Sequence, residues 1–133
     1  MIEEIIRALH RLNKETFTKQ EIEYFLKQKM EEMKNETIEL DNMTLLPMSY
    51  EVVIGDSKYV MPRKEFKVLH YLITNPNKCV TRDAILRNCW EDGVIVGNRT
   101  VDVHICKIKR RLKSKLSIYT HKGVGYKWKL NEV

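Results

Sequence analysis

The sequence predicts an α+β domain preceded by two short helices. Near its C-terminal end, apolar residues from Val101 to Leu116 recur every three or four positions, which is the spacing of one face of a helix. Short β-rich runs separated by turn residues fill residues 37–61, and two further runs flank Gly123. Strands and helices thus occupy separate stretches instead of alternating regularly, which is typical of the α+β class.

The N-terminal residues predict two amphipathic helices. The first covers residues 2–12 and places apolar side chains at alternating steps of three and four, at Ile2, Ile5, Leu9 and Leu12. The second begins at Thr18, an N-cap residue for which Glu21 completes a capping box. Because helices this short are marginal alone in water, they must pack on the rest of the chain, on a second copy or on another protein. The sequence is compatible with all three arrangements.

Residues 36–61 predict a small antiparallel sheet. Its four β-rich runs are bounded by Asp-Asn, Pro and Gly-Asp turn signals and cover Thr37–Leu40, Met43–Leu46, Tyr50–Ile54 and Lys58–Met61. The pair Gly55-Asp56 is the expected hairpin turn between the last two runs.

Three helices and a hairpin are predicted after this sheet. The first helix runs from Pro62 to about Thr74 and ends at an Asn-Pro-Asn turn. Thr81 caps the second helix, which runs to Trp90. The third covers residues 99–116, and two β-rich runs around a glycine turn then form a hairpin.

Positive charge is concentrated on the third of these helices. Six of the nine residues from Lys107 to Lys115 are basic and none is acidic. Residues 63–133 hold sixteen basic and six acidic side chains, whereas residues 36–62 hold one basic and five acidic ones and residues 1–35 are balanced. Since like charges at helical spacing repel, this excess predicts an anionic partner, and the DNA major groove is wide enough for one α-helix. The acidic sheet should then face away from the DNA.

The composition excludes several other classes of protein. No apolar run approaches the ~18 residues of a membrane helix, and the N-terminus lacks the pattern of a secretory signal. The three cysteines, without a CxxC pair, indicate reduced cytosolic thiols and neither a disulfide framework nor a zinc site. Asp102 and His104 are neighbours, but no nucleophile or metal-ligand pattern accompanies them, so we expect neither an enzyme nor a cofactor. We expect a cytoplasmic, nucleoid-associated protein.

Three stretches of the sequence resemble a known family. They are EFKVLHYLITNPNKCVTRDAILRNCW at 65–90, RTVDVHI at 99–105 and IYTHKGVGYKW at 118–128. Together they resemble the winged-helix DNA-binding domain of OmpR/PhoB-type bacterial response regulators, over roughly Ile38 to Leu130. The resemblance implies a winged helix-turn-helix with a small antiparallel sheet before the helices and a C-terminal β-hairpin wing. It divides the chain into a helical extension, residues 1–35, and a DNA-binding domain, residues 36–133.

The N-terminal extension departs from the family's usual arrangement. Members of the family usually carry a receiver domain with clustered aspartates ahead of the winged helix. Residues 1–35 are too short and have the wrong pattern for one, so we expect no control by phosphorylation. The two helices are instead candidates for bringing two copies of the chain together or for contacting another protein.

The resemblance also implies which side chains touch DNA. Residues 99–116 become the recognition helix, and Val103 and Lys107 match base-facing positions, where valine suits a thymine methyl and lysine suits guanine. Arg110 lies on the same helix face and is the third expected base contact. Asp102 is expected to cap the helix or to hydrogen-bond locally instead of reading a base. Phosphate contacts, which position the helix but carry no sequence information, are expected from Trp90, Arg99, Thr100, His104, Lys109, Arg111 and Thr120.

Two positions depart from the pattern of the family, and a third has a second possible role. Cys106 stands where the family commonly has a basic phosphate contact. Lys122, in the wing formed by residues 120–125, replaces the usual arginine of the minor groove, and lysine keeps the charge but lacks the planar fork. Trp90 is alternatively a core anchor at a helix end, because its ring is amphipathic.

The loop over residues 91–98 carries three consecutive apolar residues, Val94, Ile95 and Val96, between two glycines. In related activators this loop touches RNA polymerase. The alternative is that the apolar residues fold back onto the core.

The leading hypothesis is a sequence-specific regulator of transcription that binds double-stranded DNA. One alternative is a winged helix used for protein contact, with RNA polymerase or a replication complex. The other is a nonspecific architectural DNA binder.

Overall fold

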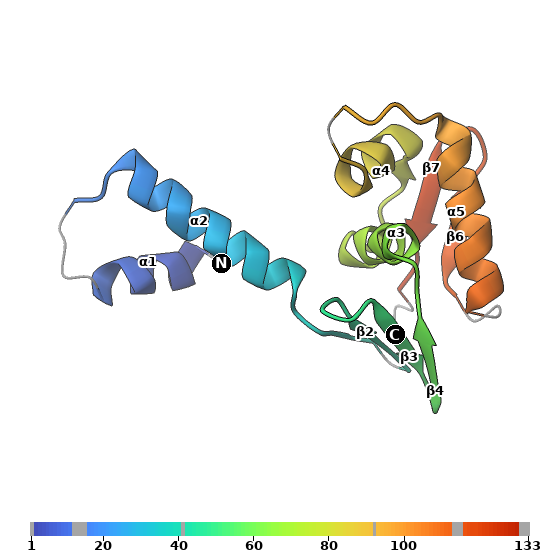
Figure 1. Cartoon of the computed structure of the whole chain (residues 1–133), viewed down its shortest axis with the longest axis horizontal. Helices are drawn as coiled ribbons and strands as arrows, with labels where there is room; N and C mark the ends of the chain where they lie inside the picture. The colour runs from blue at the N-terminus through green and yellow to red at the C-terminus, as the bar shows by residue number, and fades with distance from the viewer. Residues whose placement is uncertain (1, 12–15, 41, 92, 113–115, 131–133) are drawn as a thin grey trace.

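Two small antiparallel sheets pack around three helices, and a pair of N-terminal helices extends away from this body (Figure 1). The computed structural model describes residues 2–11, 16–40, 42–91, 93–112 and 116–130. This is the α+β architecture that the sequence predicts.

The N-terminal pair consists of α1 (Ile2–Arg11) and α2 (Lys19–Lys34). Thr18 is the N-cap of α2, and its hydroxyl oxygen accepts a hydrogen bond from the N–H of Glu21 at 3.1 Å, as the capping pattern predicts. Lys29 of α2 forms an ion pair with Glu4 of α1 at 3.0 Å, so the two helices contact one another.

The first sheet follows α2 and has the strand order β1-β2-β3-β4, with every neighbouring pair antiparallel. Its strands are β1 (Ile38–Glu39), β2 (Met43–Leu46), β3 (Glu51–Ile54) and β4 (Ser57–Val60). The predicted turn between β3 and β4 is confirmed, and Gly55 adopts φ +58°, a left-handed conformation that favours glycine. Met43, Leu45 and Val52 bury their side chains in the core of the domain.

The helical core consists of α3 (Arg63–Thr74), α4 (Arg82–Cys89) and α5 (Asn98–Arg111). Pro62 precedes α3 without a side-chain cap, whereas the hydroxyl of Thr81 accepts from the N–H of Ala84 at 3.1 Å and caps α4. The fully buried residues of this core include Leu69 and Leu72 of α3, Ile85 of α4 and Ile108 of α5.

The third core helix ends earlier than predicted. The sequence pattern extends the recognition helix to Leu116, but α5 ends at Arg111 and Leu112 forms its C-cap. Residues 113–115 lie outside the described part of the chain, and Leu116 packs against the core without being helical. The next strand begins at Ile118, so the apolar spacing at Leu116 reflects packing against the core and not a continuation of α5.

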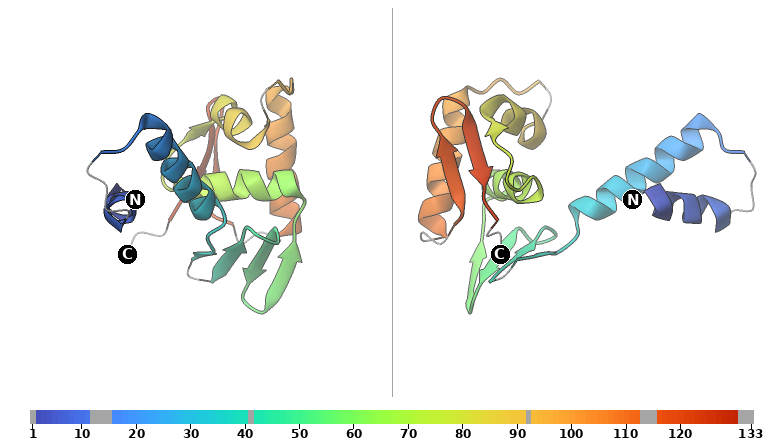
Figure 2. Two further views of the ribbon diagram at one scale, coloured as in Figure 1. Left: turned by 60° about the vertical axis from the view of Figure 1, so that its left-hand side comes forward. Right: turned by 180° about the vertical axis from the view of Figure 1, so that it is seen from behind.

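The second sheet carries the predicted wing. It contains β5 (Val80–Thr81), β6 (Ile118–His121) and β7 (Gly125–Trp128) in the order β5-β7-β6. The hairpin of β6 and β7 lies beside α5 (Figure 2). Gly125 is required where β7 meets β5, because a Cβ at this position would lie 1.9 Å from the carbonyl oxygen of Val80.

None of the helices in the described ranges combines the length and the apolar character that a bilayer crossing requires.

Candidate nucleic-acid interface

The recognition helix α5 divides into a buried face and an exposed face. Val101, Ile105 and Ile108 are buried, at the spacing that the sequence predicts. On the opposite face, Val103 is 46% exposed, and Lys107 and Arg110 are exposed too. The three predicted base contacts therefore share the solvent-facing side of one helix, at steps of four and three residues. Neither Lys107 nor Arg110 forms an ion pair with any residue in the described part of the chain.

Asp102 is held by two partners that are distant in sequence. Its Oδ1 atom accepts a hydrogen bond from Nε of Arg82 in α4 at 2.8 Å and another from the hydroxyl of Tyr126 in β7. The Arg82 guanidinium also lies over the Tyr126 ring, 5.5 Å from its centroid. A hydrogen-bonding role for Asp102 is confirmed, but the partners are not local. This network ties the recognition helix α5 to the preceding helix α4, called the positioning helix below, and to the wing.

The same contacts shift the pKa values of Asp102 and Tyr126. The Tyr126 hydroxyl and then the Arg82 guanidinium hold the pKa of Asp102 below its usual value. Burial and then the hydrogen bond to Asp102 raise the pKa of Tyr126 to about 12. At neutral pH the pair is therefore an ionised carboxylate and a neutral phenol, which is the combination that the hydrogen bond requires.

Sequence reasoning missed Arg82 and Tyr126 as members of this network. Arg82 follows the Thr81 cap and Tyr126 sits in a β-rich run, and neither position shows a local signal for pairing with Asp102. Only the fold brings the three side chains together.

Trp90 and His104 form a contact between the end of α4 and α5. Their rings meet edge to face, with centroids 5.0 Å apart and planes at 80°. Nδ1 of His104 lies 2.8 Å from the carbonyl oxygen of Thr100, so this nitrogen carries the proton and Nε2 is the atom left for a ligand. Trp90 is half-buried, in line with its second interpretation as an anchor, and its predicted phosphate contact stays a prediction.

Arg111 has an internal partner. Its Nε donates to Oε2 of Glu65 at 2.9 Å, and Glu65, on α3, is only 4% exposed. A buried carboxylate requires such a partner, because an unpaired one would be strongly destabilising. The predicted contact between Arg111 and a phosphate would have to compete with this ion pair.

The remaining predicted phosphate contacts lie at or near the surface. Arg99 and Thr120 are exposed, and Thr100 and Lys109 are half-buried. Lys122 is exposed in the turn between β6 and β7, where Gly123 adopts φ +77°. The wing therefore presents one lysine at its tip, as the sequence predicts.

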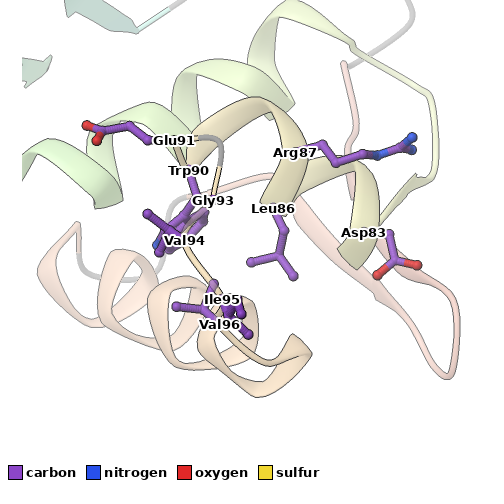
Figure 3. A pocket seen from close by; sticks show the side chains of 9 residues that line it. All are labelled: Asp83, Leu86, Arg87, Trp90, Glu91, Gly93, Val94, Ile95 and Val96. Atoms are coloured by element: carbon purple, nitrogen blue, oxygen red, sulfur yellow. The ribbon is translucent and has the colours of Figure 1, made fainter.

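The loop before α5 projects its apolar residues into solvent. Ile95 is 97% exposed and Val94 is 50% exposed, so the folded-back alternative is wrong for these two residues, whereas Val96 is half-buried. The loop borders an open pocket of about 630 Å³ against α4, and Leu86 points from α4 toward it (Figure 3).

The cysteines differ in environment. Cys89 is buried, and burial raises its pKa to about 12, so its thiol stays protonated; Cys106 is exposed on α5. Among the residues that the structure describes, no three His, Cys, Asp or Glu side chains gather as a metal site would require.

Comparisons with known proteins agree with this arrangement. The family model "Transcriptional regulatory protein, C terminal" matches residues 56–128. The chain is similar to the phosphate regulon transcriptional regulatory protein PhoB of Klebsiella pneumoniae, with 36% identity over 96 residues, which is 70% of this chain and 42% of PhoB. It is also similar to the heme response regulator HssR of Staphylococcus epidermidis, with 38% identity over 68% of this chain and 42% of HssR. The chain thus spans less than half the length of these curated relatives.

Two solved structures are similar in fold and sequence. The response regulator DrrB, a Thermotoga maritima OmpR/PhoB homolog, superposes with a TM-score of 0.65 and 27% identity, covering 88% of this chain and 55% of DrrB. The DNA-binding domain of Klebsiella pneumoniae RstA, in complex with the RstA box, gives a TM-score of 0.61 and 27% identity, covering 71% of this chain and 97% of that domain.

Proposed function

Since the chain belongs to the OmpR/PhoB-type family of C-terminal domains of transcriptional regulatory proteins, we propose that it binds double-stranded DNA at specific sequences and regulates transcription. In this proposal α5 enters the major groove and the turn between β6 and β7 approaches the minor groove. The related RstA DNA-binding domain, whose structure was solved with the RstA box, supports the binding of DNA by this fold.

One observation carries the proposal. Val103, Lys107 and Arg110 form an exposed row on α5, and the opposite face of the same helix is anchored in the core. A rigidly held helix with exposed cations suits the acceptor atoms of guanine in the major groove, and Val103 suits a thymine methyl.

Phosphate contacts by the flanking residues would fix the register of this helix. We assign them to Arg99, Thr100, His104 and Lys109 around α5, with Trp90 and Thr120 beside them, whereas Lys122 at the wing is the proposed minor-groove contact. Arg111 is the weakest of the predicted set, because Glu65 already holds its guanidinium.

Selection from a random pool of DNA duplexes at near-physiological salt tests the proposal. The purified chain should enrich a motif, and Lys107→Ala combined with Lys122→Ala should lose most of its duplex affinity. Truncation of a bidentate base contact costs about 1–3 kcal/mol on its own. Lys58→Ala combined with Lys78→Ala is the matched control, since both lysines are exposed and neither is a proposed DNA or dimer contact. Binding without an enriched motif would favour an architectural DNA binder, and no retained DNA would overturn the proposal.

The exposed loop favours a second, protein-binding activity. We propose that residues 91–98 contact RNA polymerase through Ile95, whose side chain is almost fully exposed. Val94 beside it is 50% exposed, and contiguous exposed apolar side chains mark sites of contact with another protein.

The N-terminal helices are the proposed dimerisation element. Ile6, Ile22, Met30 and Met33 are exposed on α1 and α2, and two copies of the domain could cover them when bound to adjacent half-sites. The proposed ligand is chromosomal DNA, so we place the protein in the cytoplasm at the nucleoid and assign it no catalytic role.

A further inference from the structure

A basic groove separates the start of α3 from the exposed face of α5. The groove has a volume of about 710 Å³, and its lining residues are Pro62, Arg63, Lys64, Glu65, His104, Lys107, Arg110 and Arg111. Small-molecule pockets are mostly apolar, with few polar groups. A groove lined almost entirely by cations instead suits an extended polyanion.

The acidic residue that lines this groove, Glu65, does not neutralise the positive charge of the other lining residues. Glu65 is buried and its carboxylate is engaged by Arg111, so these two charges cancel. The cations Arg63, Lys64 and Lys107 form no ion pair with any residue in the described ranges. The positive potential extends to the next turn of α3, where burial and then Arg63 and Lys64 lower the pKa of Lys67.

Lys64 is already held in position for a ligand. Its Nζ donates to the carbonyl oxygen of Cys89 at 3.2 Å and lies 5.7 Å from the centroid of the Trp90 ring. Trp90 in turn contacts His104, so a continuous row of side chains runs from α3 across the end of α4 to α5. An ammonium group has three donors, so two of them remain available. Because the side chain is fixed beforehand, binding would cost little conformational entropy.

Arg63 is exposed, whereas its neighbour Lys64 is half-buried. It lies at the first position of α3 and its guanidinium forms no ion pair or hydrogen bond with any residue that the structure describes. A guanidinium can bind a phosphate with two parallel hydrogen bonds, whereas the adjacent ammonium acts as a point charge.

We propose that Arg63 and Lys64 bind the DNA backbone at phosphates beyond those contacted by the recognition helix. The inference rests on the proposed function, since Lys107 and Arg110 line both the groove and the base-facing side of α5. The sugar-phosphate backbone of the DNA strand at the edge of the major groove continues along the basic groove of the protein. The start of α3 thereby becomes part of the DNA interface.

The dependence of DNA affinity on salt tests this assignment. Each neutralised phosphate contributes about 0.9 to the slope of log K against log salt. In the selected duplex, Arg63→Gln combined with Lys64→Gln should therefore lower the slope by about 1.8 and reduce affinity roughly 60-fold at ~0.1 M salt. The sequence preference should not change, because the proposed contacts of these two residues are to phosphates. Lys58→Gln combined with Lys78→Gln changes the net charge equally at two exposed positions outside the proposed interface and should leave the slope unchanged.

The single variant Arg63→Gln keeps the test decisive if the loss of Lys64 disturbs the fold near Cys89. It should lower the slope by about 0.9, and ethylation of one outer phosphate should interfere with wild-type binding but not with binding of this variant. If the wild type binds its motif and Arg63→Gln retains the wild-type slope and ethylation pattern, the groove assignment is overturned while the proposed function stands. If the wild type binds no duplex, both proposals fall.

Discussion

Asp102 and Arg82 join the recognition helix to the positioning helix through a hydrogen-bonded ion pair with an Nε–Oδ1 distance of 2.8 Å. The same carboxylate oxygen accepts a hydrogen bond from the hydroxyl of Tyr126, so the wing is attached at the same point. The recognition helix, the positioning helix and the wing are thereby fixed relative to one another without bound DNA. Such preorganisation reduces the entropic cost of binding.

Removal of the Tyr126 hydroxyl should weaken this junction without creating a cavity. Tyr126→Phe should lower the free energy of unfolding by about 1–2 kcal/mol, since a hydrogen bond to a charged group is lost within a mostly buried side chain. Urea unfolding followed by circular dichroism measures the difference. Tyr119→Phe, in the exposed part of β6, is the matched control and should be near neutral. Equal effects of the two substitutions would argue against the junction.

The pH dependence of stability should report the same network. The pKa of Tyr126 is raised to about 12 in the folded state, compared with about 10 in an unfolded chain. Its contribution is therefore complete below about pH 10 and is lost as the pH rises toward 12. The pKa of Asp102 is lowered, so its contribution is complete above its unfolded pKa of about 3.9 and is lost as the pH falls through the lower folded value.

Unfolding of the wild type and of Tyr126→Phe at a series of pH values tests the predicted loss of the Tyr126 contribution at high pH. The difference in unfolding free energy between the two proteins should be constant from about pH 6 to 9 and should shrink above about pH 10. A difference that stays constant through about pH 11 would contradict the assignment of this hydroxyl to Asp102.

Gly125 should tolerate no side chain. A Cβ there would lie 1.9 Å from the carbonyl oxygen of Val80, so Gly125→Ala must separate β7 from β5. We expect a loss of about 2–3 kcal/mol in unfolding free energy, as for other overpacked sites. Gly97→Ala is the control, because a Cβ at that position would have no neighbouring atom within 4 Å, and it should cost less than about 1 kcal/mol. Thermal unfolding of both variants distinguishes the two sites.

Local rules predicted the elements of this fold well. The caps at Thr18 and Thr81 and the turn at Gly55 depend on residues within four positions, and each is confirmed. The end of α5 was predicted too late, because Leu116 continues the apolar spacing but packs against the core from outside the helix. Burial alone does not specify backbone conformation.

The candidate site was predictable only where it lies on one helix. Val103, Lys107 and Arg110 share a face because the helical period places them there. The partners of Asp102 lie 20 and 24 residues away, and the partner of Arg111 lies 46 residues away, so their pairing depends on how the helices and strands pack. Exposure of the loop residues Val94 and Ile95 likewise depends on the course of the chain after α4.

Substitution of Ile95 should impair activation of transcription without affecting DNA binding. Its side chain is 97% exposed, so Ile95→Ser should change the unfolding free energy by less than about 0.5 kcal/mol. Duplex affinity should also stay unchanged, because the loop lies outside the proposed base and phosphate contacts. If this loop contacts RNA polymerase, transcription from a promoter carrying the selected motif should fall severalfold in a purified system. Val60→Ser, at an exposed position on β4, is the matched control and should leave transcription unchanged. Wild-type transcription by Ile95→Ser would remove the loop from the proposed polymerase contact and leave the DNA-binding proposal intact.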